Sequence, residues 1–88
     1  MFLHLGNDIS VRAKDVVAVH DYKIFRDGAN REYLEEHRSR NRVIDAANAG
    51  QPRKSLVVAG GYLYVSAISP LTLKRRTSLA TDDSDLER

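Results

Sequence analysis

The chain has no cysteine and no long apolar run, and each absence excludes a class of protein. With zero cysteines in 88 residues, it has no disulfide framework, no thiol nucleophile and no cysteine-based zinc or iron–sulfur site. No stretch approaches the eighteen consecutive apolar residues of a transmembrane helix. The apolar start, residues 1–5, lacks a basic flank and stops at Gly6, too early for a signal peptide. We therefore expect a cytoplasmic protein with no membrane partner.

Patterns that support catalysis are also missing. His4, His20 and His37 match no metal-ligand spacing. The glutamates within residues 31–42 are interleaved with arginines, which indicates a solvated salt-bridged surface rather than a catalytic acid pair. The serines occur in no nucleophile-elbow pattern. The sequence predicts a protein that is not an enzyme and has no metal, cofactor or small-molecule substrate.

The size and charge favour a small domain with an anionic partner. A chain of 9.9 kDa has a thin core, and oligomerisation often supplies the missing stability at this size. The net charge is +2, but residues 82–88 carry four acids and one base. The remaining body has 13 basic and 8 acidic residues, a net charge of +5. We expect one domain over residues 1–80 and an acidic, disordered tail over residues 81–88.

Turn residues and apolar alternation predict an α+β fold, a small and mostly antiparallel sheet with two helices. The hairpin signal is clearest at Gly60-Gly61, which lies between two β-branched and aromatic runs and therefore suits a turn better than a phosphate cradle. Ser69-Pro70 has the residue types of a helix start. The expected strands cover residues 2–5, 9–11, 16–20, 43–46, 55–59 and 62–66, and the expected helices cover residues 31–42 and 71–79.

The first of these helices has a weak apolar face. Asn30 is its expected N-cap, and Tyr33 and Leu34 are its main apolar residues. Arginine–glutamate pairs at helical spacing, Arg31–Glu35 among them, support the helix. Either it lies loosely on the sheet or it contributes to a contact between subunits. The second helix is expected to reach the core through Leu71, Leu73 and Leu79.

Three basic groups remain as candidate binding residues: Arg12 with Lys14, Arg53 with Lys54, and Lys74 with Arg75 and Arg76. Cations at the rim of a sheet are able to contact phosphates while the sheet holds the backbone rigid. The alternative is that scattered cations only keep a small protein soluble. Charge alone leaves both interpretations open.

The order of several segments resembles the RemB/RemA-type extracellular-matrix (biofilm) regulators. The likeness covers about residues 1–79, and no single motif within it is diagnostic. It rests on the opening FLHLGND, on KDVVAV with DYK, on GQPRKSLVV, on YLYVS and on SPLTLKRR. It fails over the predicted helix 31–42 and over the acidic tail.

The resemblance implies a bacterial cytoplasmic transcription regulator that binds DNA. It implies a subunit similar to LytTR DNA-binding domains, assembled into a ring-like homo-oligomer with double-stranded DNA around its outside. Carried over residue by residue, Lys14 or Arg12 corresponds to one DNA-contacting position of RemA-type proteins, and Arg53 with Lys54 corresponds to the other. The resemblance implies consecutive arginines after the glycine, whereas this chain has Gln51 and Pro52 before Arg53, a departure that would remove one phosphate contact.

These observations lead to two hypotheses. In the first, the chain is a DNA-binding regulator that contacts the DNA backbone through Arg12, Lys14, Arg53 and Lys54, with Lys74, Arg75 and Arg76 as second-rank candidates. In the second, it is an oligomeric scaffold or adaptor that binds another regulatory protein without contacting DNA. The acidic tail and the poorly anchored helix fit the second hypothesis equally well.

Overall fold

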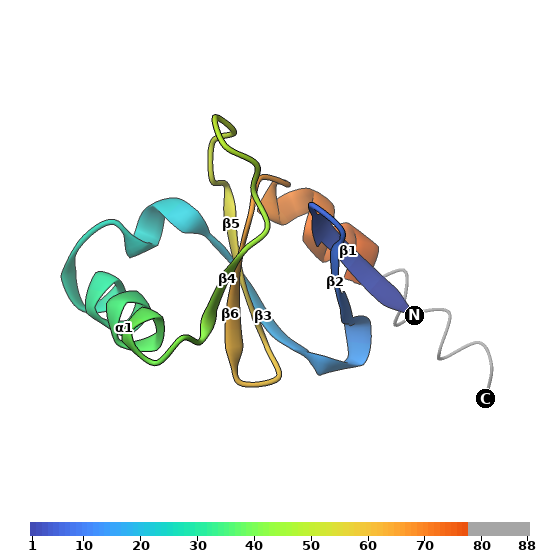
Figure 1. The fold of residues 1–88 in the computed structure, drawn as a ribbon. Coiled ribbons are helices and arrows are strands. Elements are labelled where there is room, and N and C mark those ends of the chain that lie inside the picture. Colours follow the sequence, from blue (N-terminus) through green and yellow to red (C-terminus); the bar gives the residue numbers. More distant parts are fainter. Residues whose placement is uncertain (78–88) are drawn as a thin grey trace.

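A four-stranded sheet forms the middle layer of the molecule (Figure 1). The computed structural model describes residues 1–77. The strand order is β3-β5-β6-β4, with β5 (Ser55–Ala59) and β6 (Tyr62–Ser66) at the centre and β3 (Val16–Asp21) and β4 (Val43–Asp45) at the edges. Only the β4–β6 pairing is parallel. The structure thus confirms a small α+β fold with a mostly antiparallel sheet.

The central hairpin forms as expected at Gly60-Gly61. Both glycines have positive φ, 58° and 82°, the backbone conformation that a tight two-residue turn between twisted strands requires. Four of the five residues of β5 are buried, because elements pack on both faces of the sheet. This hairpin is the rigid frame to which the basic loops are attached.

One face of the sheet is covered by the hairpin of β1 (Phe2–Gly6) and β2 (Ile9–Arg12) and by the helix at residues 70–77. The buried cluster on this side comprises Leu3, Leu5, Val11, Val19, Ala46, Val57, Ala59 and Leu73. Two fully buried serines tie the layers together: Ser66 Oγ donates to Leu5 O at 2.6 Å and Ser55 Oγ donates to Ile68 O at 2.5 Å. Each hydroxyl donates to a carbonyl of the covering layer, so the serines join that layer to the sheet at little desolvation cost.

The opposite face is covered by a 3-10 turn, η2 (Tyr22–Phe25), and by α1 (Gly28–Ser39) (Figure 1). Phe25, Leu34, Leu56 and Leu63 form the buried cluster there. Leu34 is the only buried residue of α1, whereas Tyr33 is 41% exposed. The weak apolar face predicted for this helix is therefore confirmed.

The limits of α1 differ from the prediction. The helix begins at Gly28, with Asp27 rather than Asn30 at the N-cap position, and Arg31 N donates to Asp27 O. It ends at Ser39 because Asn41 turns the chain with a φ of 58°. The expected Arg31–Glu35 pair does not form, since Glu35 pairs with Arg38 at 3.7 Å.

The helix at residues 70–77 begins as its sequence indicates. Ser69 Oγ accepts the backbone N–H of Thr72 at 3.2 Å, which is N-capping by a serine hydroxyl. Leu73 is fully buried, but Leu71 is 68% exposed and does not serve as the expected core contact. Leu79 and the predicted tail, 81–88, lie outside the described residues. Within residues 1–77, no helix has the length and apolarity to span a membrane.

Candidate nucleic-acid interface

The structure places the two leading basic groups at opposite ends of the sheet. Lys14 lies in η1 (Ala13–Asp15). This turn directly precedes Val16, which pairs with Ala59 at one end of β5. Arg53 and Lys54 precede Ser55 at the other end of β5. Four strand steps separate the two ends, about 13 Å at the usual rise per residue. A single subunit therefore does not bring these groups together.

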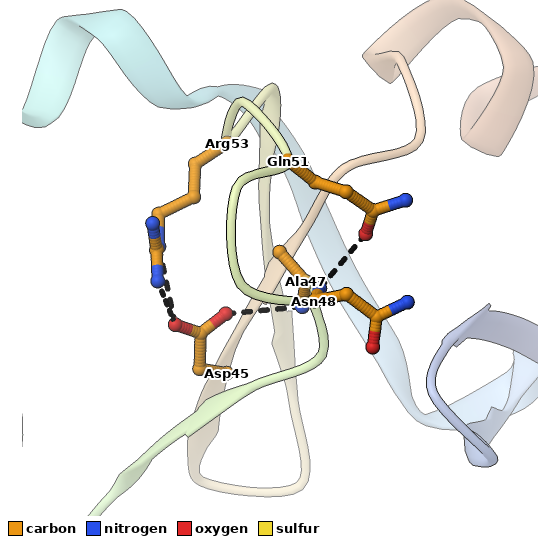
Figure 2. A network of polar contacts seen from close by, with 5 residues as sticks. All are labelled: Asp45, Ala47, Asn48, Gln51 and Arg53. Carbon is orange, nitrogen blue, oxygen red and sulfur yellow. Dashed lines mark hydrogen bonds and ion pairs between the residues drawn. The ribbon is translucent and has the colours of Figure 1, made fainter.

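Arg53 is carried by a loop, residues 46–54, that leaves β4 and returns into β5 (Figures 1 and 2). Both ends of this loop are held to β6: Ala46 N donates to Val65 O at 2.7 Å and Lys54 N donates to Ser66 O at 2.9 Å. Because the ends are tied to the central hairpin, the loop presents its cations from a rigid base.

The loop is also closed from within. The backbone N–H of Asn48 donates to Gln51 Oε1 at 2.8 Å, and the backbone N–H of Gln51 donates to Asn48 O at 3.1 Å. Gln51 thus stabilises the turn in this chain (Figure 2). Gln51, one of the two residues at which the resemblance implies a departure, therefore has a structural role of its own.

Arg53 is engaged by Asp45, the last residue of β4. Nε of Arg53 donates to Asp45 Oδ2 at 3.1 Å, and Nη2 donates to the same oxygen (Figure 2). These hydrogen bonds and the charge of the Asp45 carboxylate raise the pKa of Arg53 above its ordinary value. The guanidinium is fixed in place and its side chain is 43% exposed, but two of its donors are already used.

Lys54 differs from its neighbour because its ammonium group is unpaired within the described part of the chain. Its backbone is fixed on both sides: its N–H donates to Ser66 O, and its C=O accepts the N–H of Tyr22 at 3.0 Å. An exposed cation on an anchored backbone suits phosphate binding, since the backbone needs little further ordering.

The other end of the sheet shows the same division between a paired and an unpaired cation. Arg12 Nε donates to Asp15 Oδ2 at 2.9 Å, so Arg12 is held across η1. Lys14 is exposed and, among residues 1–77, its ammonium group has no partner. We therefore rank Lys14 above Arg12 as a phosphate contact.

The third group lies on the helix at residues 70–77, where Lys74, Arg75 and Arg76 are all exposed. This helix follows β6, and the end of β6 at Ser66 pairs with Ser55 next to Lys54. The helix thus begins at the end of the sheet that carries Arg53 and Lys54. It packs on the face opposite α1, through Leu73.

The histidines and the acidic residues are the remaining candidates from the sequence. Among the described residues, no three histidine or acidic side chains come together in a way that would hold a metal ion. His37 sits at the last turn of α1, where Nδ1 lies 2.9 Å from Tyr33 O. This contact is local to the helix.

The sequence analysis did not identify Asp45, whose carboxylate accepts hydrogen bonds from Arg53. The two lie eight positions apart, and only the path of loop 46–54 brings them into contact. It also missed the contact of Arg42 with Tyr62, whose ring centroid lies 5.1 Å from the guanidinium carbon. No local pattern indicates either pair.

Comparisons with known proteins agree with the resemblance seen in the sequence. The family model described as "Extracellular matrix regulatory protein A-like" matches residues 2–77. The chain is similar to Extracellular matrix regulatory protein B of Bacillus subtilis (strain 168), with 36% identity over 76 residues, 86% of this chain and 89% of that protein. The chain belongs to the RemA-like family of extracellular matrix regulatory proteins.

Proposed function

We propose that the chain is a cytoplasmic transcription regulator that binds double-stranded DNA through its phosphate backbone. The observation that carries the proposal is an exposed lysine at each end of the sheet, Lys14 and Lys54, whose ammonium group has no partner among residues 1–77. The backbone of Lys54 is also anchored on both sides. Such contacts supply affinity and position without reading base sequence. Arg53 and Arg12 contribute further phosphate contacts at the two ends when their ion pairs with Asp45 and Asp15 open.

The proposed binding form is a homo-oligomer of LytTR-like subunits arranged in a ring. The two cationic ends are about 13 Å or more apart in one subunit, so a head-to-tail contact would set the Lys14 end of one copy beside the Lys54 end of the next. Repetition of the same contact closes a ring when the rotation permits it. Exposed apolar side chains support such contacts, with Phe2 at 69% and Val17 at 77% exposure.

Ring assembly would also raise the electrostatic contribution. One subunit body has a modest positive charge, whereas a ring repeats it along the DNA and links the contacts of all copies. The DNA would be held by many individually weak phosphate contacts. The affinity of the protein for DNA should therefore fall steeply as the salt concentration rises.

The experiment is a titration of the full chain into fluorescent duplex DNA at two salt concentrations, followed by anisotropy. Strong binding at low salt that weakens steeply at high salt supports the proposal. Absence of binding at low salt, from protein whose light-scattering mass shows an oligomer, overturns it. That outcome would favour an adaptor that uses α1, in which Leu34 is the only buried residue, to bind another protein.

A further inference from the structure

We propose that a pocket beside Arg53 binds a small organic phosphate or carboxylate, with the anion between Arg38 and Arg53 and an apolar or aromatic body against the floor. The pocket has a volume of about 320 Å³ and lies between η2, α1, β4 and the end of loop 46–54. Its lining residues are Tyr22, Arg38, Val43, Asp45, Arg53 and Val65.

The floor of the pocket is apolar and rigid. Val65 is 1% exposed and lies in β6, and Val43 packs against the buried cluster of Phe25, Leu34 and Leu56. Tyr22 forms a wall and packs against the same cluster, while its backbone N–H is fixed by Lys54 O. Tyr22 and Val43 give the pocket an apolar side for the body of a ligand, while charged side chains make up the other half of its lining residues.

The rim carries two guanidinium groups. The described contacts of Arg53 use Nε and Nη2, both on one oxygen of Asp45, and leave Nη1 without a partner among residues 1–77. Arg38 makes only a long contact to Glu35, 3.7 Å, and both side chains are more than half exposed. Such a pair contributes little, so Arg38 is free to turn toward an anion. Planar guanidinium groups recognise phosphate and carboxylate through paired hydrogen bonds.

The volume limits the ligand. A pocket of about 320 Å³ is at the lower end of the range for ligand sites, so it suits a single ring or sugar with one anionic group rather than a dinucleotide. Asp45 holds Nε and Nη2 of Arg53, so an anion that binds this guanidinium through paired hydrogen bonds competes with Asp45 for its donors. Binding would therefore compete with the Asp45–Arg53 ion pair.

The consequence for regulation rests on the proposed function, because Arg53 is also a proposed DNA contact. A ligand anion held by Arg53 would remove that contact and lower DNA affinity. The pocket would then be an effector site that reads a small anionic metabolite.

The first test measures ligand binding to the pocket in the absence of DNA. Phenyl phosphate, inorganic phosphate and phenol are titrated into ¹⁵N-labelled full-length protein, and amide shifts are followed by NMR. We expect saturable shifts around Tyr22, Val43 and Arg53 with phenyl phosphate, at least about tenfold weaker binding of inorganic phosphate and none of phenol. Equal affinity for phenyl phosphate and inorganic phosphate overturns the proposed apolar subsite, and no saturation below about 10 mM overturns the site.

Variants separate the pocket from general charge attraction. Arg38→Gln should weaken phenyl phosphate about fivefold, and Asp45→Asn should tighten it about threefold, because the competing carboxylate is lost. Arg31→Gln, on the same helix but outside the pocket, is the matched control and should change nothing. If Arg31→Gln and Arg38→Gln have equal effects, the anion is held by net charge and the proposal is wrong.

The second test adds DNA. Phenyl phosphate should lower the DNA affinity of the wild type and have a smaller effect on Arg38→Gln at the same concentration. If the wild type binds phenyl phosphate but not DNA, the proposed function is overturned and the proposed ligand site is supported. If DNA binding is measured and the ligand leaves it unchanged in both proteins, the regulatory role is overturned.

Discussion

The Asp45 carboxylate joins two structural tasks: one oxygen accepts hydrogen bonds from Nε and Nη2 of Arg53, and the other accepts the backbone N–H of Ala47 at 3.0 Å. The first contact fixes the guanidinium at the end of the sheet. The second shapes the start of loop 46–54. A cation proposed to bind DNA is thus held by an acid of the same subunit, and a DNA phosphate competes with that acid for the guanidinium.

Asp45→Asn should increase DNA affinity. The asparagine side chain keeps an oxygen that is able to accept the Ala47 N–H, but it removes the negative charge that occupies Arg53 and repels phosphate. We expect about threefold tighter binding, with a salt slope that is steeper by about 0.9 for each additional phosphate that a subunit neutralises. Anisotropy titrations at several salt concentrations measure both quantities. Weaker binding by a variant with wild-type thermal stability would contradict the role assigned to Asp45.

Lys54→Ala should weaken DNA binding without changing sequence preference. The ammonium group is exposed and unpaired within residues 1–77, so stability should change by less than about 0.5 kcal/mol. Loss of one phosphate contact should make the salt slope shallower by about 0.9. Arg31→Ala, an exposed basic residue on α1, is the control. Equal losses from both variants would indicate a nonspecific charge effect.

Ser66→Ala should destabilise the fold by about 2 kcal/mol. The Ser66 hydroxyl donates to Leu5 O at 2.6 Å and accepts Ile68 N–H at 3.1 Å in a fully buried position. Its removal leaves two backbone groups unsatisfied, each at a cost of about 1 kcal/mol or more. Denaturant unfolding measures the change, and Ser10→Ala, on the exposed side of β2, should be nearly neutral. A loss below about 0.5 kcal/mol would show that Ser66 does not join the layers.

Gly6→Ala should destabilise the docking of the β1–β2 hairpin on loop 46–54. A Cβ at Gly6 would lie 2.8 Å from Ala46 O, and the residue has a φ of 123°. We expect a loss of about 3 kcal/mol from contact and backbone strain together. Gly50→Ala also has positive φ, 85°, but its Cβ would meet open space, so its smaller loss estimates the strain alone. Equal losses would mean that the close approach to Ala46 does not matter.

The parts of the fold that depend on local signals are predictable from the sequence. Paired glycines at Gly60-Gly61 mark the central hairpin, and Ser69-Pro70 marks the start of the last helix, because these residue types suit the backbone that the structure uses there. The start of α1 differs from the sequence prediction: the helix begins at Gly28, shortly after Phe25, which packs in one buried cluster with Leu34 and Leu56. The N-capping propensity of Asn30 is a local signal and does not include this tertiary contact.

The candidate site was only partly predictable for the same reason. The cations at positions 12, 14, 53 and 54 are visible as residue types, and their rim positions follow from the strands. Whether each is paired depends on where the acids come to lie. Asp15 is three residues from Arg12, but Asp45 reaches Arg53 only through the fold of loop 46–54.

The most direct test of the account compares the salt dependence of DNA binding between the wild type and the double variant Lys14→Ala/Lys54→Ala. Each lysine lies at its own end of the sheet, so the losses should add. We predict that the salt slope of the double variant is shallower than the wild-type slope by about 1.8 per bound subunit. An unchanged slope, in a variant that retains the wild-type oligomeric mass, would contradict the claim that this protein holds DNA through the two ends of its sheet.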